Sequence, residues 1–205
     1  GAPLPFGLAE MATAVAALLR HLDAPPRFAV GHSAGVPVLM QLALQRDIAP
    51  QHLLGVCPAL VAPPAWYVRL VAPVLAAVVE SDAVAAGGAW VAQRTPLVRL
   101  MLESAGSSLT APQFARYEWL CRQPDHVHAA LSMMSRWDLP ALMRDAAALR
   151  TPLTLLAGRG DRWVPLPALR RAAARLPTAT LVDVPGGHLL PEERPDEVLA
   201  RIEGP

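Results

Sequence analysis

The sequence predicts an α/β fold: a mostly parallel sheet flanked by helices, with a helical insertion in its middle. Short apolar runs alternate with runs of helical spacing in residues 1–62 and again in residues 139–205, a pattern typical of parallel sheets. Between them, residues 63–138 contain no convincing strand. The 205 residues suffice for one domain with a substantial core. We therefore predict a sheet core in two chain segments, 1–62 and 139–205, and a helical cap or lid over 63–138.

The first third of the chain alternates helix and strand. Apolar residues three and four positions apart predict a helix over residues 6–22. Short apolar runs predict strands at 28–30 and 51–56, with a helix at 33–45 between them. The order α-β-α-β favours parallel strands with helices on the faces of the sheet.

The predicted cap consists of helices joined by short loops. Thr110 before Pro112 indicates a helix N-cap with proline just inside the helix. We expect most aromatic and methionine side chains here to pack the helices, and some to line a pocket. The helices are predicted at 65–80, 82–93, 95–104, 111–122 and 125–136.

The last third returns to alternating elements. Asp138 is placed to cap a helix that has Pro140 in its first turn. Two further apolar runs have the length of buried strands, and each is followed by a helix-like run. In chain order we predict a helix at 139–149, a strand at 152–157, a helix at 166–176, a strand at 178–184 and a closing helix at 191–202.

Composition excludes several classes of function. A formal net charge of +1, with basic residues that are all arginine and do not cluster, gives no reason to expect a nucleic-acid partner. Although 53% of the residues are hydrophobic, no uninterrupted apolar run is long enough to predict a transmembrane segment. Cys57 and Cys121 are far apart and lack the spacing of a metal or redox site, so we expect reduced thiols in a cytoplasmic protein without a metal or cofactor.

Residues 31–35 form the motif Gly-His-Ser-Ala-Gly, with a strand predicted before it and a helix after it. That context is typical of a nucleophile elbow, in which a serine projects from a tight strand-to-helix turn. Glycine at positions 31 and 35 suits the close packing expected around the turn. The backbone N–H of Ala34, at the helix start, is our candidate oxyanion donor. The alternative is a Gly-Ser turn that only connects two elements.

An acid and a histidine follow the last two predicted strands. Asp161 comes directly after the strand at 152–157, and His188 after the strand at 178–184. Because parallel strands bring their carboxyl ends to one edge of the sheet, Ser33, Asp161 and His188 are predicted to meet there. Histidine can take the serine proton, and an aspartate can fix the tautomer of that histidine. The alternatives are an Asx-turn role for Asp161 and a simple loop histidine at 188; Asp138 is a competing acid that fits a helix cap better.

Four further residues are candidates for binding substrate. His32 adjoins the serine, and we expect it to shape the elbow region without transferring a proton. Trp163 lies in the same loop as Asp161, while Met134 and Trp137 belong to the predicted cap. Apolar side chains of this kind suit the wall of a pocket for an acyl chain or a flat ring system.

Ser33, Asp161 and His188, with this order of elements, resemble the α/β-hydrolase superfamily. A closer resemblance is to the magnesium-chelatase accessory proteins of bacteriochlorophyll biosynthesis, a family with that fold. It implies a role near magnesium insertion into protoporphyrin IX in photosynthetic bacteria, with magnesium chelatase as a partner and any magnesium belonging to the substrate or the partner. The segments that carry the resemblance are 6–11, 31–35, 48–50, 106–109, 133–139 and 188–195.

The resemblance also implies elements that precede this sequence. Only 32 residues stand before Ser33, and one helix and one strand use them. The superfamily places further strands and the loop with the second oxyanion donor ahead of the elbow. We therefore expect the N-terminal strands and that donor to be missing from this chain.

Three functions remain open from the sequence. The first is a serine hydrolase acting on a small apolar ester or a tetrapyrrole ester. The second is a non-catalytic accessory protein that binds a tetrapyrrole. The third is a generic carboxylesterase, or a haloperoxidase-like or lyase relative, without a link to pigments. The presence of Ser33, Asp161 and His188 together favours the serine hydrolase, since a protein that only binds a ligand has no need of all three.

Overall fold

The computed structural model describes residues 7–61, 87 and 96–202. The chain divides into two compact units. The sheet unit comprises Leu8–Ala62, Ala105–Ser108 and Asp138–Pro205, and the helical unit comprises Gly1–Gly7, Pro63–Ser104 and Leu109–Trp137. The helix predicted at 65–80 and all but residue 87 of the helix predicted at 82–93 lie outside the described residues.

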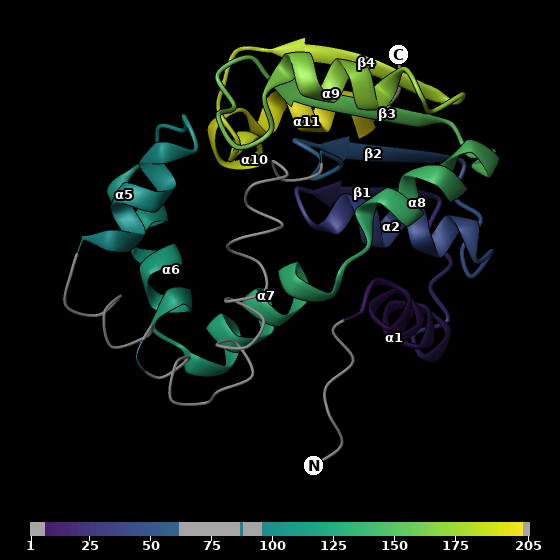
Figure 1. The fold of residues 1–205 in the computed structure, drawn as a ribbon, viewed down its shortest axis with the longest axis horizontal. Helices are drawn as coiled ribbons and strands as arrows, with labels where there is room; N and C mark the ends of the chain where they lie inside the picture. Colours follow the sequence, from purple (N-terminus) through teal and green to yellow (C-terminus); the bar gives the residue numbers. More distant parts are fainter. Residues whose placement is uncertain (1–6, 62–86, 88–95, 203–205) are drawn as a thin grey trace. The chain divides into compact units, whose positions relative to one another are not determined.

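In the part of the chain that the structure describes, the sheet has four strands that are parallel throughout, in the order β1-β2-β3-β4 (Figure 1). All four predicted strands are confirmed, with ends that differ from the prediction by at most two residues. Strand order follows chain order, as expected when each crossover returns next to the preceding strand. The strands are β1 Phe28–His32, β2 His52–Val56, β3 Leu153–Gly158 and β4 Ala179–Val184.

Helices cover both faces of this sheet. A Cβ placed on Gly55 would lie 2.9 Å from Val36 Cγ1, so that face of β2 packs against α2. The alternate residues Leu54 and Val56 pack with Val198 of α11 on the other face. In Figure 1, α9 lies in front of the strands and α11 behind them. The helices of this unit are α1 Leu8–His21, α2 Gly35–Leu44, α8 Leu139–Asp145, α9 Leu166–Ala173, α10 Leu190–Glu193 and α11 Pro195–Ile202.

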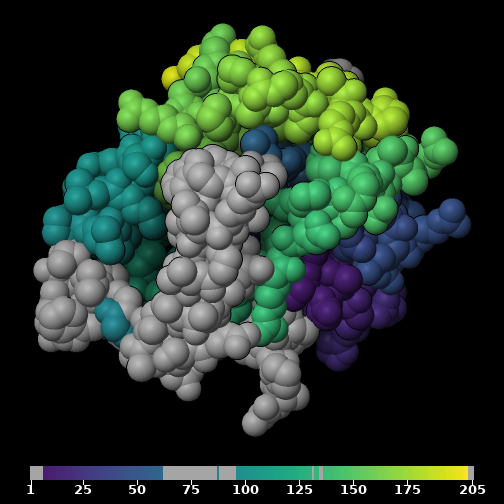
Figure 2. Space-filling view, viewed as in Figure 1, coloured from purple at the N-terminus to yellow at the C-terminus, as the bar shows by residue number. Residues whose placement is uncertain are grey.

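The N-terminal helix packs on the helix that follows the elbow. The face of α1 that turns inward is buried at Ala12 and Ala16, and α2 is buried at Met40 and Leu42. Alanines allow the two helices to approach closely. The purple surface of α1 adjoins the blue surface of α2 in Figure 2. This packing helps to hold α2 in place, and with it the turn that precedes the helix.

Three helices of the last third differ from their predicted bounds. The helix predicted at 166–176 ends at Ala173. The helix predicted at 139–149 stops at Asp145 and continues as a 3₁₀ turn, Ala146–Ala148. The closing helix predicted at 191–202 is two helices, α10 and α11, separated at Arg194 (φ −140°, ψ 57°). The prediction of one helix was wrong because Pro195 forces the residue before it out of the helical region.

The helical unit contains α5 Leu97–Ser104, α6 Ala111–Cys121 and α7 Pro124–Arg136 among its described residues. Thr110 stands at the N-cap of α6, and its N–H and hydroxyl both donate to Gln113 Oε1 at 2.8 Å. Phe114 is buried, with the Arg99 guanidinium 4.4 Å from its ring centre. Trp119 is 61% exposed, so it is an exception to the expectation that most aromatic side chains here pack the helices.

Within the described residues, no helix combines the length and the apolar character that crossing a membrane requires.

Candidate active site

Ser33 occupies the turn between β1 and α2 with a left-handed backbone (φ 50°). This strained conformation is the one expected of a serine at a nucleophile elbow. A Cβ on Gly31 would lie 2.8 Å from the carbonyl carbon of Gly35, so only glycine fits at position 31. At Gly35, by contrast, a Cβ would meet no described atom within 4 Å. The expectation that position 35 must be small for lack of space was therefore wrong; its backbone is what approaches Gly31.

Backbone hydrogen bonds fix the elbow to the second strand. The Ser33 N–H donates to the Val56 carbonyl (2.9 Å), and the Ser33 carbonyl accepts from the N–H of Ala59 (3.1 Å). Ala34 has helical angles (φ −63°, ψ −21°) at the N-cap of α2. Its N–H thus belongs to the first turn of a helix, where backbone donors lack partners within the helix.

Ser33, His188 and Asp161 meet in one line of hydrogen bonds. Ser33 Oγ lies 2.8 Å from His188 Nε2, and His188 Nδ1 lies 2.8 Å from Asp161 Oδ2. The histidine and the aspartate are buried, with 2% and 6% of their surface exposed. With Asp161 ionised, its carboxylate accepts the Nδ1 proton, which leaves Nε2 free to accept from the serine hydroxyl. The sheet thus brings together the three residues that the sequence singled out.

The Asp161 carboxylate uses its two oxygens differently. Oδ2 faces His188, while Oδ1 accepts the N–H groups of Trp163 (2.9 Å) and Val164 (2.8 Å). Oδ1 therefore makes the local turn contacts that the Asx-turn alternative expected, and Oδ2 makes the hydrogen bond to the histidine. Asp138, the competing acid, accepts from the Ala141 N–H at 2.9 Å and caps α8, as its place in the sequence predicted.

The loop that carries His188 is held by contacts that sequence analysis did not predict. The Gly187 N–H donates to Glu193 Oε1 at 3.0 Å, and the Leu189 N–H donates to Ser107 Oγ at 2.8 Å. Glu193 lies at the end of the four-residue helix α10, from which its carboxylate turns back to the loop. For Ser107, the only signal was its place in segment 106–109 of the family resemblance.

His32 links the elbow to the histidine loop. Its Nε2–H donates to the His188 carbonyl oxygen at 2.8 Å, and the two ring centres are 5.3 Å apart. Burial lowers the pKa of His32 below its usual 6.5, so the ring stays neutral at neutral pH. A neutral ring that donates through Nε2 suits a structural role beside Ser33.

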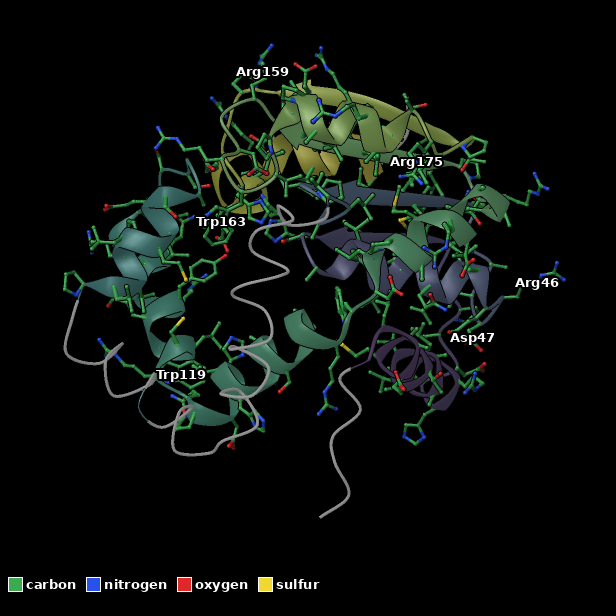
Figure 3. The ribbon with its side chains drawn as sticks, viewed as in Figure 1. Arg46, Asp47, Trp119, Arg159, Trp163 and Arg175 are labelled. Atoms are coloured by element: carbon green, nitrogen blue, oxygen red, sulfur yellow. The ribbon has the colours of Figure 1, made fainter. Side chains whose placement is uncertain are left out.

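Trp163 lies in the acid loop, labelled in Figure 3, with its ring centre 5.0 Å from that of His188. It is 43% exposed, which leaves one part of the indole open beside the histidine. Trp137 follows α7 in the helical unit. Met134 belongs to α7, but its side chain lies outside the described residues. Substrate contact by these residues stays a prediction.

Cys57 is a third buried neighbour of the acid and the histidine. Its Sγ and the ligand atoms of Asp161 and His188 all lie within 4.8 Å of one another. Burial raises the pKa of the Cys57 thiol to about 12, and the thiol donates to the Gly187 carbonyl at 3.5 Å. A metal ion binds thiolate rather than thiol, and the other two groups already share a hydrogen bond. The donor set therefore fits a protonated thiol that supports the loop better than it fits a metal.

The fold and this arrangement define an α/β hydrolase. The profile of the alpha/beta hydrolase family matches residues 1–201, and the chain belongs to that family. Among curated proteins, it is 34% identical over 207 aligned residues to the magnesium-chelatase 30 kDa subunit of Rhodobacter capsulatus, covering 96% of this chain and 69% of that protein.

Solved structures show the same fold at lower identity. An alpha/beta hydrolase fold protein from Burkholderia ambifaria matches with a TM-score of 0.73 at 24% identity, over 96% of this chain and 72% of that one. A putative lipase from Acinetobacter baumannii matches with a TM-score of 0.75 at 13% identity, over 99% and 68%. A thermophilic esterase from Thermogutta terrifontis matches with a TM-score of 0.69 at 21% identity, over 96% and 71%.

Proposed function

We propose that this protein is a serine hydrolase that cleaves an ester or a similar acyl group through an acyl-enzyme. The observation that carries the proposal is the pair of 2.8 Å hydrogen bonds that joins Ser33 to His188 and His188 to Asp161. Serine is a weak nucleophile unless a neighbouring base takes its proton, and a base oriented by a third group is the arrangement that does so.

In the proposed reaction, His188 Nε2 takes the Ser33 hydroxyl proton as Oγ attacks the carbonyl carbon of the substrate. The Ala34 N–H stabilises the negative charge that develops on the carbonyl oxygen. His188 then gives its proton to the leaving alcohol as the carbon–oxygen bond breaks, leaving an ester on Ser33. Water repeats the sequence, with His188 again as base, and releases the acid.

Asp161 and His32 support these steps without touching the substrate. Asp161 keeps the Nδ1 proton of His188 in place and stabilises the imidazolium that forms in each half-reaction. His32 holds the backbone of His188 through its carbonyl oxygen (2.8 Å). Trp163 is the proposed aromatic wall of the substrate site, since its exposed ring adjoins the base. Met134 and Trp137 of the helical unit are kept as proposed substrate-binding residues.

The relative's name favours a tetrapyrrole as the substrate or ligand. The R. capsulatus protein is called a magnesium-chelatase subunit, so we propose a tetrapyrrole ester as substrate and magnesium chelatase as partner. The second candidate function, a tetrapyrrole-binding accessory protein without catalysis, rests on the same 34% identity. Cys57 and Cys121 are both free thiols, which supports our proposal of a reducing, cytoplasmic location.

A fluorophosphonate probe tests the proposal, because it reacts only with an activated serine. We expect mass spectrometry to find the label on Ser33 of the full-length protein, and Ser33→Ala to abolish it. Labelling would be followed by assays on simple esters and on tetrapyrrole esters. A folded protein that stays unlabelled would overturn the hydrolase mechanism. Titration with protoporphyrin IX and its magnesium complex, monitored by absorbance, would then test the binding function.

A further inference from the structure

Four residues of the sheet unit come from the middle of the helical region. The segment Ala105–Ser108 follows α5 and precedes α6 in the sequence, yet it belongs to the same compact unit as the sheet. Ala105 and Ser107 in this segment are buried, while Ser108 is exposed. A short insertion buried among two functional loops needs a reason beyond connecting two helices.

One backbone oxygen of this segment joins both loops of the site. The Ala105 carbonyl accepts the N–H of Arg162 in the acid loop and the N–H of His188 in the histidine loop, each at 3.3 Å. Both lone pairs of a carbonyl can accept, so the two bonds are compatible. The acid and the base are thus held to a common point, separate from their own hydrogen bond.

Ser107 adds a side-chain contact to the histidine loop. Its Oγ accepts the Leu189 N–H at 2.8 Å, and the residue is 8% exposed. Leu189 is 4% exposed, so its N–H would lack a partner if the hydroxyl were removed. The bond fixes the backbone one residue beyond His188, where a small rotation would move the imidazole away from Ser33.

The backbones around this segment are also too close to tolerate extra atoms. Gly106 has a left-handed backbone (φ 78°), and a Cβ there would clash with the Gly160 carbonyl oxygen. A Cβ on Gly187 would clash with the Gly106 backbone and with Ser107 Oγ. The backbone of the segment is therefore in close contact with the backbones of both loops.

We propose that Ala105–Ser107 is a brace that positions the acid and histidine loops, and that Ser107 is a positioning residue for His188. This inference rests on the proposed hydrolase function, since it assigns the brace to the same reaction. Ser107 does not contact the reacting atoms; it acts by holding Leu189, and through Leu189 the imidazole.

Three variants of the full-length protein test the brace. Ser107→Ala removes the acceptor, Ser107→Cys replaces it with a weaker one, and Ser108→Ala is the matched control at an exposed position. The first readout is the rate of fluorophosphonate labelling at Ser33 and its pH profile. The second is the downfield proton NMR signal of the Asp161–His188 hydrogen bond. Thermal unfolding checks that each variant is folded.

We expect Ser107→Ala to slow labelling by roughly ten- to a hundredfold, because small misplacements of catalytic groups cost up to about 10² in rate. Ser107→Cys should fall between Ser107→Ala and the wild type, and Ser108→Ala should match the wild type. The proton signal should weaken or broaden in the same order. A purely structural serine would change the melting temperature without this graded change in rate and signal.

The result that overturns the brace is wild-type labelling and an unchanged proton signal in Ser107→Ala. Unfolding of both Ser107 variants would also overturn it, since the residue would then serve stability rather than position. If the wild type itself does not label, the hydrolase function fails, and the proton signal alone decides the brace. Loss of the signal in Ser107→Ala but not in Ser108→Ala would then support positioning without catalysis.

Discussion

The acid loop and the histidine loop are neighbours at the edge of one sheet, but the side chains that support them come from different places. In the acid loop the carboxylate of Asp161 itself accepts N–H groups two and three residues ahead, while backbone N–H groups of the loop donate to the carbonyls of Ala105, Val184 and Gly186. The histidine loop is held largely from a distance. Its backbone bonds reach Ala105, Ser107, His32 and Cys57, which are far away in the sequence, and Glu193 nearby.

This difference indicates where each loop is vulnerable. The acid loop keeps the local bonds of its own carboxylate when other side chains change, provided that the carboxylate keeps one acceptor oxygen. A loop stabilised by four separate segments loses its geometry when any one of them changes, although each single bond contributes only about 1 kcal/mol. The four predictions below test this contrast, from the largest expected effect to the smallest.

Asp161→Asn should separate the two uses of the carboxylate. The amide oxygen can still accept from Trp163 and Val164, but the amide nitrogen would face His188 Nδ1 and favour the wrong tautomer. We expect fluorophosphonate labelling to fall by about 10⁴ while the melting temperature changes little. Loss of the fold in this variant would contradict local support of the acid loop through one carboxylate oxygen, and Asp138→Asn is the control at an acid that only caps a helix.

Gly187→Ala should disrupt the histidine loop through space alone. A Cβ at this position clashes with the Gly106 backbone, and overpacking of this kind costs about 1–3 kcal/mol. We expect a lower melting temperature together with slower labelling. Gly35→Ala, where a Cβ meets no described atom within 4 Å, serves as the stability control and should not destabilise. Equal melting temperatures of the two variants would show that the histidine loop can shift to make room for the added Cβ.

His32→Ala should change how stability depends on pH. Burial lowers the pKa of His32 in the folded state below 6.5, so the unfolded chain binds more protons below that pH, and stability falls as pH falls. The stability that His32 contributes is therefore present above pH 6.5 and is lost on acidification. Urea unfolding should show that the wild type and the variant differ less in free energy of unfolding at about pH 5 than at about pH 7. The same difference at both pH values would contradict a titration of His32 that is coupled to folding.

Cys57 should stay unreactive until the chain unfolds. Its pKa is raised to about 12 by burial, so the thiolate that alkylating reagents attack is scarce at neutral pH. We expect iodoacetamide to modify Cys121, which is partly exposed, before Cys57. As pH rises from 9.0 toward about 12, the unfolded chain loses its thiol proton first, and stability should fall. Cys57→Ala should lessen that alkaline loss.

The local parts of this structure could be predicted from the sequence. Periodicity and the motif at 31–35 predicted the four strands and the elbow, because both depend on neighbours in the chain. The break at Arg194 was missed because the helical spacing of residues 191–202 outweighed the signal of Pro195. The contacts of His32, Cys57 and Ser107 with the histidine loop were beyond prediction, since partners 82 to 156 residues apart leave no local pattern.

The wide sequence separation at the site has a consequence for the order of events during synthesis. Ser33 and His188 are 155 residues apart, and the strand that leads to His188 is at the far edge of the sheet from the strand that leads to Ser33. Contacts of such high order form late, because the intervening chain must first be ordered. A nascent chain therefore carries an elbow without a base while residues 34–187 are being translated. The proposed nucleophile would stay inert until β4 has joined the sheet.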